Sequence, residues 1–325
     1  MNPSRRFFSL SALACAVVAT AGTALAQFPE KPLRIVVGAP AGGSADIIAR
    51  TLSEGLTQQL GQPVMVDNKP GGAGLIGLQE VLKAPRDGHT VMVSVNGLVS
   101  EIPHAMKMPV DPMKELRPVA ELARTGLLFV GSPQVPASNV KEVIAYIKAN
   151  PGKVNFASYS PGSLSHTLGL EFNKLTGTDM AHVGYKGSPP ALTDLIGGHV
   201  SFMFDGPATS IPMIKGGKIK VFATTAPARL SMLPDVPTFA ELGYKDLTET
   251  AWMGLFVAAD VPAAAQTRLR EAVLKVLEQP AVRQRFAALG LDMAPPASPD
   301  ELVRSLRTAS ERQAATLKAV GFKPE

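Results

Sequence analysis

The feature that most constrains the fold is a short apolar strand that runs into a glycine turn and then into a helix. Leu33–Val37 is mostly apolar and contains β-branched residues, which is typical of a buried strand. Pro40 and the Gly42-Gly43 pair end it. Ser44 is a favoured N-cap residue, and Asp46 lies in the expected first helical turn, where a negative charge suits the helix dipole. The stretch therefore predicts a strand–turn–helix unit.

Such a turn leaves backbone N–H groups unpaired at the start of the helix. Its glycines allow another molecule to approach the backbone closely, and the helix N-terminus adds about half a positive charge. The sequence therefore predicts an anion site built from backbone rather than from Lys or Arg. A plain turn that binds nothing is the alternative.

Two nucleotide-binding motifs are incomplete here. Gly38 and Gly43 have Walker-A spacing, but Ser44 stands where the phosphate-binding lysine belongs. Gly72–Gly77 fits G-x-G-x-x-G, yet the next expected strand ends in Asn96 and supplies no acidic residue for a ribose. We therefore expect no nucleotide, and no cofactor of any kind.

The first 26 residues are typical of an export signal. Arg5 and Arg6 precede an apolar run, and Ala24–Ala26 is an A-x-A cleavage site. The paired arginines also resemble a twin-arginine signal, so either export route is open. Cys15 could be a lipoprotein cysteine, but the residues before it form a poor lipobox, and cleavage after Ala26 is preferred. The predicted location is the periplasm.

Composition excludes several classes of protein for the rest of the chain. No cysteine remains after residue 26, and a chain of this length buries a large core without disulfides. Without Arg5 and Arg6 the formal charge falls from +5 to +3, and the remaining basic residues are scattered, which argues against nucleic-acid binding. No later stretch is apolar and long enough to span a bilayer.

Strand-like and helix-like segments alternate along the chain, which predicts an α/β fold with mostly parallel sheets. The strand–turn–helix design recurs where Val154–Ala157 leads into the turn Ser158–His166. We expect two lobes whose turns face each other across a cleft. Residues 27–125 and 226–325 are assigned to the first lobe, and residues 126–225 to the second, with Ile219–Thr224 leading back to the first.

The other expected elements follow from the same apolar patterns. Strands are expected at 64–66, 90–95, 127–130, 180–185, 200–204 and 253–257, and helices at 140–149, 164–175, 189–197, 264–277, 281–289 and 299–317. No regular structure is predicted for 103–118.

The chain offers few residues for catalysis. Its five histidines lack metal-ligand spacing. Ser163, His166 and Asp205 are the residue types of a hydrolase triad, but the sequence around Ser163 lacks the closing glycine of G-x-S-x-G. Ser163 and Ser165 are explained more simply as helix caps or as donors to a ligand. We therefore expect no enzyme; a periplasmic serine hydrolase is the alternative.

Several longer stretches together resemble one family, the Bug/TctC periplasmic solute-binding proteins of tripartite tricarboxylate transporters. They run in family order over nearly the whole mature chain: 40–50, 68–77, 87–90, 162–166, 183–187, 195–198, Arg229 with 233–238, and 252–255.

The resemblance implies two periplasmic-binding-protein lobes joined by two crossing strands, with a ligand carboxylate held largely by backbone amides and water. The turns concerned match 41–45 and 160–166, with further pocket walls from the loops that begin at Gly71 and Asn96. The ligand-binding residues it predicts are Ala41, Gly42, Gly43, Ser44, Ala45, Asp46, Gly71, Asn96, Ser160, Gly162, Ser163, Ser165, His166 and Asp205. Ala39 and Ala45 depart from the family pattern beside the anion turn, so a relative's ligand does not transfer directly.

The resulting expectation is an exported, monomeric solute-binding protein that captures a small organic carboxylate without a metal or cofactor. Its partners would be the membrane permease subunits of a tripartite tricarboxylate-type transporter, or alternatively a membrane sensor.

Overall fold

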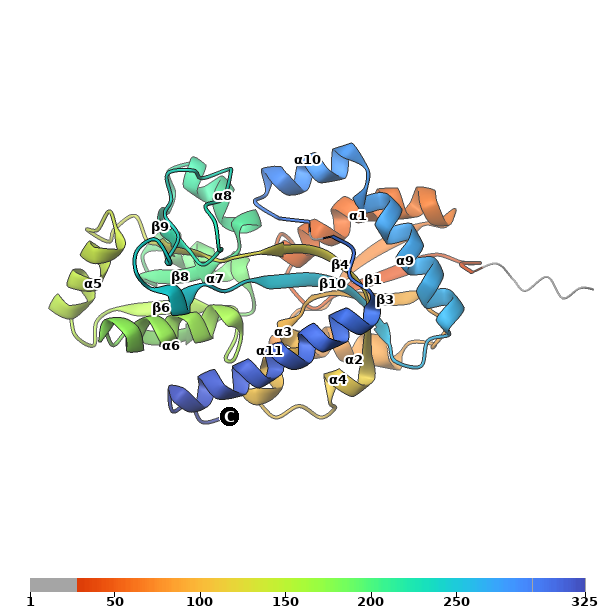
Figure 1. Cartoon of the computed structure of the whole chain (residues 1–325), viewed down its shortest axis with the longest axis horizontal. Helices are drawn as coiled ribbons and strands as arrows, with labels where there is room; N and C mark the ends of the chain where they lie inside the picture. The colour runs from red at the N-terminus through yellow and green to blue at the C-terminus, as the bar shows by residue number, and fades with distance from the viewer. Residues whose placement is uncertain (1–27, 294, 325) are drawn as a thin grey trace, which may run out of the picture.

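The computed structural model describes residues 28–293 and 295–324, so the predicted signal, Met1–Ala26, lies outside the described residues. Two lobes lie side by side along the long axis of the molecule, each built on a five-stranded sheet (Figure 1). The first sheet has the order β2 (Val64–Asn68), β1 (Leu33–Val37), β3 (Thr90–Val95), β10 (Ala251–Ala258), β4 (Leu116–Thr125). The second has the order β7 (Ala181–Gly184), β6 (Asn155–Ser158), β8 (Phe202–Asp205), β5 (Leu128–Gly131), β9 (Lys220–Thr224).

Both sheets are mixed: in each, four strands point the same way and one is reversed. In lobe 1, β1 pairs parallel with β2 and β3, whereas β10 runs antiparallel to both β3 and β4. In lobe 2, β6 pairs parallel with β7 and β8, whereas β5 runs antiparallel to β8 and β9. The predicted two-lobed α/β fold with mostly parallel sheets is confirmed.

Two connections join the lobes. β4 leads directly into β5, and the chain returns from β9 through a long irregular segment into β10, which pairs with β4 along its length (Figure 1). The connections touch at Gly126, where an added Cβ would lie 2.3 Å from the backbone nitrogen of Ala226. Close packing of backbone against backbone fixes the place where the two lobes meet.

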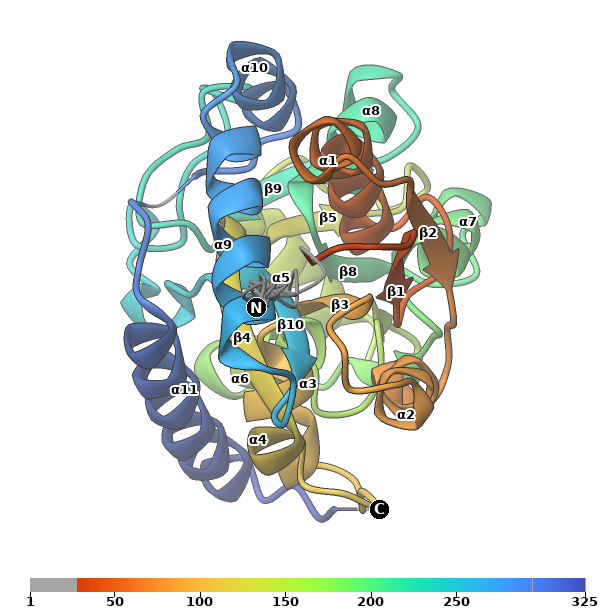
Figure 2. The ribbon, with the colours of Figure 1, turned by 90° about the vertical axis from the view of Figure 1, so that its right-hand side faces the viewer.

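Helices cover both faces of the first sheet. α1 (Ser44–Leu60), α9 (Ala263–Leu277) and α10 (Pro280–Ala288) pack on one face, where their apolar stripes bury Ile48, Leu269 and Phe286. α2 (Leu75–Lys83), α3 (Gly97–Ser100) and α11 (Pro299–Ala319) pack on the other, around Trp252 and Phe256. Figure 2 shows α1 and α10 above β1 and β3, and α2 below them. β1, β3 and β10 are therefore buried on both sides, whereas the edge strand β2 is partly exposed.

The second lobe has two cores as well. α5 (Val140–Ala149) and α6 (Leu164–Thr176) cover a cluster of phenylalanines in which Phe129 stacks on Phe204 at 4.7 Å between ring centroids. α7 (Ser188–Gly197) and α8 (Pro207–Lys215) cover the opposite face.

The segment after β9 packs with lobe 2. Ala226 and Leu230 belong to the core beneath α7 and α8, and Phe239 and Leu247 belong to the phenylalanine cluster. We therefore propose that lobe 2 extends to about Thr250 instead of ending at residue 225. Ile219–Thr224 does not lead directly back to lobe 1: it forms β9, the edge strand beside β5.

Five regular elements were not predicted. β4 and the short helix α4 (Pro112–Glu115) start within the stretch expected to be irregular, and α2, α3 and α8 were not expected at all. In α8, Pro207 lies in the first turn, where a proline needs no N–H partner, whereas Pro212 lies inside the helix and removes one of its hydrogen bonds.

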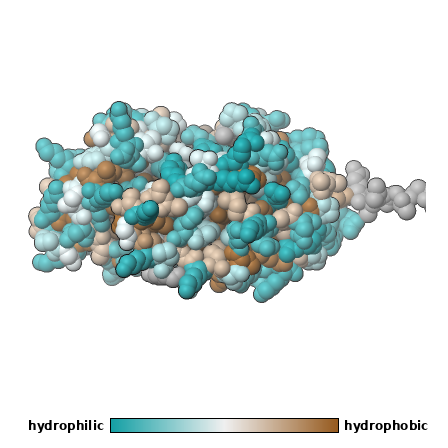
Figure 3. Space-filling view, turned by 60° about the horizontal axis from the view of Figure 1, so that its bottom comes forward, coloured by the Kyte–Doolittle hydropathy of each residue, from teal (hydrophilic) through white to brown (hydrophobic). Residues whose placement is uncertain are grey.

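The last long helix contacts both lobes. α11 packs on α3 and β4 of lobe 1, and Gln313 Nε2 donates to the carbonyl of Gly162 in lobe 2 at 2.9 Å. On the face shown in Figure 3, hydrophobic residues are interspersed among hydrophilic ones. Within residues 28–293 and 295–324, no helix combines the length and hydrophobicity that crossing a membrane would need.

Candidate functional site

A cavity of about 480 Å³ lies between the two lobes. Lobe 1 supplies its β1–α1 turn, the loop 71–74 and residues around α3, while lobe 2 supplies the turns before α6, α7 and α8. The connecting strands close it with Thr125, Leu127, Ala251 and Met253. Most of this wall is glycine, backbone or apolar side chain.

Five helices begin at this cavity, but in α2, whose N-cap Gly74 lines it, the first N–H groups are already paired with the carbonyls of Gly71 and Gly72. The N-caps of the other four, Gly43 of α1, Ser163 of α6, Gly187 of α7 and Gly206 of α8, line it as well. Each of these four N-termini carries unpaired N–H groups and about half a positive charge. Among the described lining residues the one basic residue is Lys186, which is exposed. Any positive potential in the cavity therefore comes mainly from backbone.

The β1–α1 turn has the expected form with one correction. The N-cap of α1 is Gly43, and Ser44 is the first helical residue, so Ser44 does not cap the helix with its side chain. Gly42 adopts a φ of 78°, a left-handed conformation that favours glycine. Gly43, Ser44 and Ala45 line the cavity, whereas Ala41 and Gly42 form the exposed tip of the turn outside it.

Asp46 braces this turn from behind and does not line the cavity. Its carboxylate accepts hydrogen bonds from the Gly42 backbone N–H at 2.8 Å and from Arg50 Nε at 2.9 Å. Burial alone would raise the pKa of Asp46, but the hydrogen bonds from Arg50 and Gly42 outweigh it and hold the pKa below its usual value. The carboxylate thus fixes the turn while keeping its charge away from an anion.

The turn before α6 uses its polar groups internally. Ser163 Oγ donates to the Ser160 carbonyl at 2.8 Å, and Ser165 Oγ donates to the Phe204 carbonyl at 2.5 Å. His166 Nδ1 accepts the N–H of Gly162 at 3.0 Å. Ser160 and Ser163 line the cavity, whereas Gly162, Ser165 and His166 lie behind it.

Ser163, His166 and Asp205, the residue types of a hydrolase triad, form no hydrogen bonds with one another. His166 packs on His182 with 3.9 Å between ring centroids, and burial, followed by the charge of His182, lowers its pKa to about 3. Asp205 takes its hydrogen bonds elsewhere, and Ser163 donates to a carbonyl. The described residues therefore lack the serine–histidine–carboxylate chain that a hydrolase of that kind needs.

Asp205 is fully buried behind the cavity wall. It accepts hydrogen bonds from Tyr159 at 2.9 Å, Thr209 at 2.7 Å and Ser210 at 2.6 Å, and burial raises its pKa above the usual value despite these donors. The Tyr159 hydroxyl in turn accepts the N–H of Gly206. Asp205 therefore holds Tyr159, which lines the cavity, and does not itself face a ligand.

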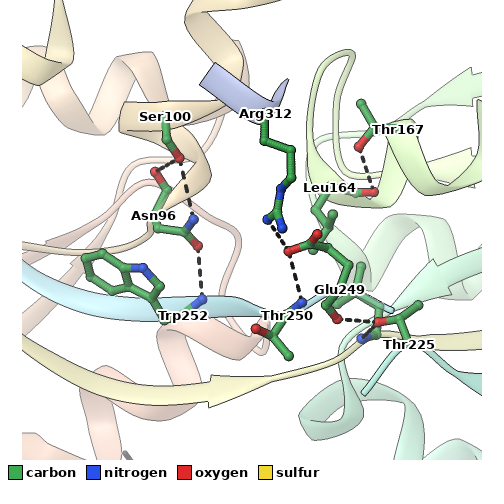
Figure 4. Close-up of polar contacts among 10 residues, drawn as sticks. Asn96, Ser100, Leu164, Thr167, Thr225, Glu249, Thr250, Trp252 and Arg312 are labelled. Atoms are coloured by element: carbon green, nitrogen blue, oxygen red, sulfur yellow. Dashed lines mark hydrogen bonds and ion pairs between the residues drawn. The ribbon is translucent and has the colours of Figure 1, made fainter. Parts of the chain in front are cut away.

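Asn96 ties α3 to the strand β10. Its Oδ1 accepts the backbone N–H of Trp252 at 3.0 Å, and its own backbone N–H donates to the Trp252 carbonyl (Figure 4). Its neighbours Val95 and Gly97 line the cavity, as does the predicted Gly71, but Asn96 does not.

Three residues at the cavity escaped the sequence analysis. Tyr159 lies inside a turn that was singled out, but its partner Asp205 is distant in sequence. Ser188 follows Gly187 at the start of a predicted helix, and its buried hydroxyl lies near the Asp205 carboxylate, whose pKa it acts to lower. Glu101 lies between the expected strand 90–95 and the stretch 103–118, where no element or motif was predicted, so nothing in the sequence marked it.

The two lobes are in contact around the cavity. A Cβ at Gly187 would lie 2.8 Å from Cδ of Pro40, and one at Gly162 would lie 2.1 Å from Cβ of Ala105. Both approaches join lobe 1 to lobe 2, so the structure represents a closed form.

Comparison with known proteins gives a consistent result. The family model for the tripartite tricarboxylate transporter family receptor (TctC) matches residues 48–322. The chain is 31% identical over 314 residues to the protein BugT of Bordetella pertussis, covering 94% of this chain and 95% of that protein.

Solved structures with bound ligands are similar over most of the chain. MatC from Rhodopseudomonas palustris with bound malate is 30% identical, with a TM-score of 0.83 over 89% of this chain and 100% of that one. R. palustris Rpa4515 with adipate is 27% identical, with a TM-score of 0.87 over 92% of this chain and 100% of that one.

Proposed function

Because this chain belongs to the TctC receptor family of tripartite tricarboxylate transporters, we propose that it captures a small organic carboxylate in the interlobe cavity for uptake by the membrane subunits of such a transporter. The observation that carries the proposal is the convergence of four helix N-termini on one cavity in which Lys186 is the one basic lining residue. Relatives solved with malate and adipate support the ligand class.

Capture follows from the chemistry of the wall. A carboxylate placed at the start of α1 meets the N–H groups of Ser44 and Ala45, and α7 presents its own N-terminus and the Ser188 hydroxyl from the other lobe. Charge-assisted hydrogen bonds of this kind contribute about 1.5–3 kcal/mol each. A cavity of about 480 Å³ is within the range of small-molecule sites.

Closure of the two lobes strengthens these contacts with the ligand. Each turn alone offers a few donors in water, where a hydrogen bond gains little. Once the lobes meet, water is excluded and every polar contact strengthens. The free energy of closure comes from ligand contacts that exist only in the closed form. The closed form, displayed in the periplasm after removal of the export signal, is what the membrane partner would recognise; a membrane sensor could read the same form.

A thermal-shift screen of small carboxylates against residues 27–325, followed by calorimetry, tests the proposal. A ligand at one hundred times its Kd adds about 2.7 kcal/mol to the stability of the folded protein, a readily measured shift. Stabilisation by a carboxylate, but not by its amide, is expected. If no carboxylate stabilises the protein at millimolar concentration, the proposed function is wrong.

A further inference from the structure

Glu101 is an acidic side chain built into the wall of the cavity. It follows α3, and its side chain folds back over that helix, since a Cβ at Gly97 would lie 2.6 Å from Glu101 Oε2. The residue is 8% exposed and lines the cavity. Burial, followed by the charge of Glu249, raises the pKa of its carboxyl group to about 7. A carboxyl group buried in a binding cavity needs hydrogen-bond donors or an opposite charge to offset the cost of its burial.

The partner of Glu101 lies on the other lobe. The backbone N–H of Leu164, the first residue of α6, acts on its carboxylate and favours the charged form. The helix N-terminus that the sequence analysis assigned to the ligand carboxylate therefore lies beside an acidic side chain of the protein itself. The N-termini of α1, α7 and α8 remain available to the carboxylate of a ligand.

The other charged or polar side chains near Glu101 are paired with other residues and do not donate to it. Arg312 of α11 is paired with Glu249, which precedes β10 and also accepts the N–H of Thr250 (Figure 4). His104, three residues further on, is turned to Ser310 of α11 at 2.7 Å. A carboxylate has about four acceptor positions, and among the described residues no side chain donates a hydrogen bond to Glu101, while the N–H of Leu164 acts on it. Glu101 therefore brings unfilled acceptor positions to the cavity that it lines.

We propose that Glu101 is a specificity residue: it selects monocarboxylates that carry an ammonium group at the end remote from the carboxylate, and it disfavours dicarboxylates of the same length. This inference rests on the proposed function. An ammonium group would supply the donors that Glu101 lacks, in a charge-assisted hydrogen bond. A second ligand carboxylate at the same place would face a like charge, which neither group tolerates well in a closed cavity.

Calorimetry with matched ligand pairs tests the inference. At pH 8, 4-aminobutanoate, 5-aminopentanoate and 6-aminohexanoate would be compared with succinate, glutarate and adipate. The native protein should bind at least one amino acid about tenfold or more tighter than its dicarboxylate partner. Glu101→Gln should reduce that ratio by about tenfold or more, whereas Glu54→Gln, an exposed acid on α1, should leave it unchanged.

A second test changes the pH and uses only the native protein. Lowering the pH from 8 to 6 protonates Glu101 and should tighten binding of the dicarboxylates relative to the amino acids. A ratio that is the same in Glu101→Gln and the native protein, or a native preference for the dicarboxylates at pH 8, would overturn the inference while leaving carboxylate capture intact. Absence of binding by all six ligands would overturn the inference, whereas the proposed function is wrong only if no carboxylate of the screen binds.

Discussion

Replacing Gly187 with alanine tests whether the lobes must approach as closely as the closed structure shows. Gly187 has a φ of 100°, and the added Cβ would lie 2.8 Å from Cδ and 3.2 Å from Cγ of Pro40 on the opposite lobe. The proline ring cannot rotate away, so the contact must be relieved by separating the lobes. Overpacking of this kind costs about 1–3 kcal/mol.

The variant carries two penalties that can be separated. The backbone conformation of Gly187, with φ 100° and ψ −176°, is essentially restricted to glycine and costs alanine about 1–3 kcal/mol in the open and closed forms alike, so it lowers stability without changing affinity. The contact with Pro40 exists only when the lobes are closed, and therefore weakens binding by about 5-fold to 150-fold. Gly217→Ala is the matched control, because Gly217 has a φ of 65° but nothing within 4 Å of the added Cβ.

Chemical denaturation measures the first penalty and calorimetry the second. Both variants should lose unfolding free energy without ligand, and only Gly187→Ala should lose affinity for the best carboxylate of the screen. Equal dissociation constants for the two variants would refute the reasoning, because the bound form would then not require Pro40 and Gly187 to meet.

Three further outcomes can be measured by denaturation. Asp205→Asn should lower the free energy of unfolding by about 1–3 kcal/mol, because the amide nitrogen would face hydroxyl donors; an unchanged denaturation midpoint would contradict the bracing role of Asp205. The pKa of Asp46 is depressed in the folded protein, so its stabilisation is complete above the unfolded-state value of about 4 and is lost as the pH falls through the folded value. Asp46→Asn should therefore lose less stability on acidification than the native protein, and parallel losses would argue against the brace. Phe239→Ala should cost about 3–5 kcal/mol, which would show that the segment after β9 supports the core of lobe 2; a loss below 1 kcal/mol would not fit.

The sequence was most informative where local patterns decide the structure. The apolar run of β1 and the glycine turn before α1 are local features, and both formed as predicted. β4 was missed because its sequence LRPVAELART mixes charges and a proline into a strand that is buried by partners far away in the chain. Ser44 was taken as the N-cap because serine is favoured there, but Gly43 occupies that position.

The same contrast between local sequence patterns and long-range packing applies to the candidate site. The turns at Gly43 and Ser163 could be found because glycine and serine before an apolar helix have a physical meaning on their own. The positions of Asp205 and Asn96 behind the wall depend on Tyr159 and Trp252, partners that tertiary packing brings near. Glu101 meets Leu164 only because two lobes close on each other, which no local pattern encodes.

The most direct test of the central claim is a crystal structure of the chain with the tightest-binding carboxylate of the screen. We predict that the lobes are closed and that the ligand carboxylate lies within hydrogen-bond distance of the N–H groups of Ser44 and Ala45. A carboxylate paired with a Lys or Arg side chain, or bound outside the interlobe cavity, would contradict the account.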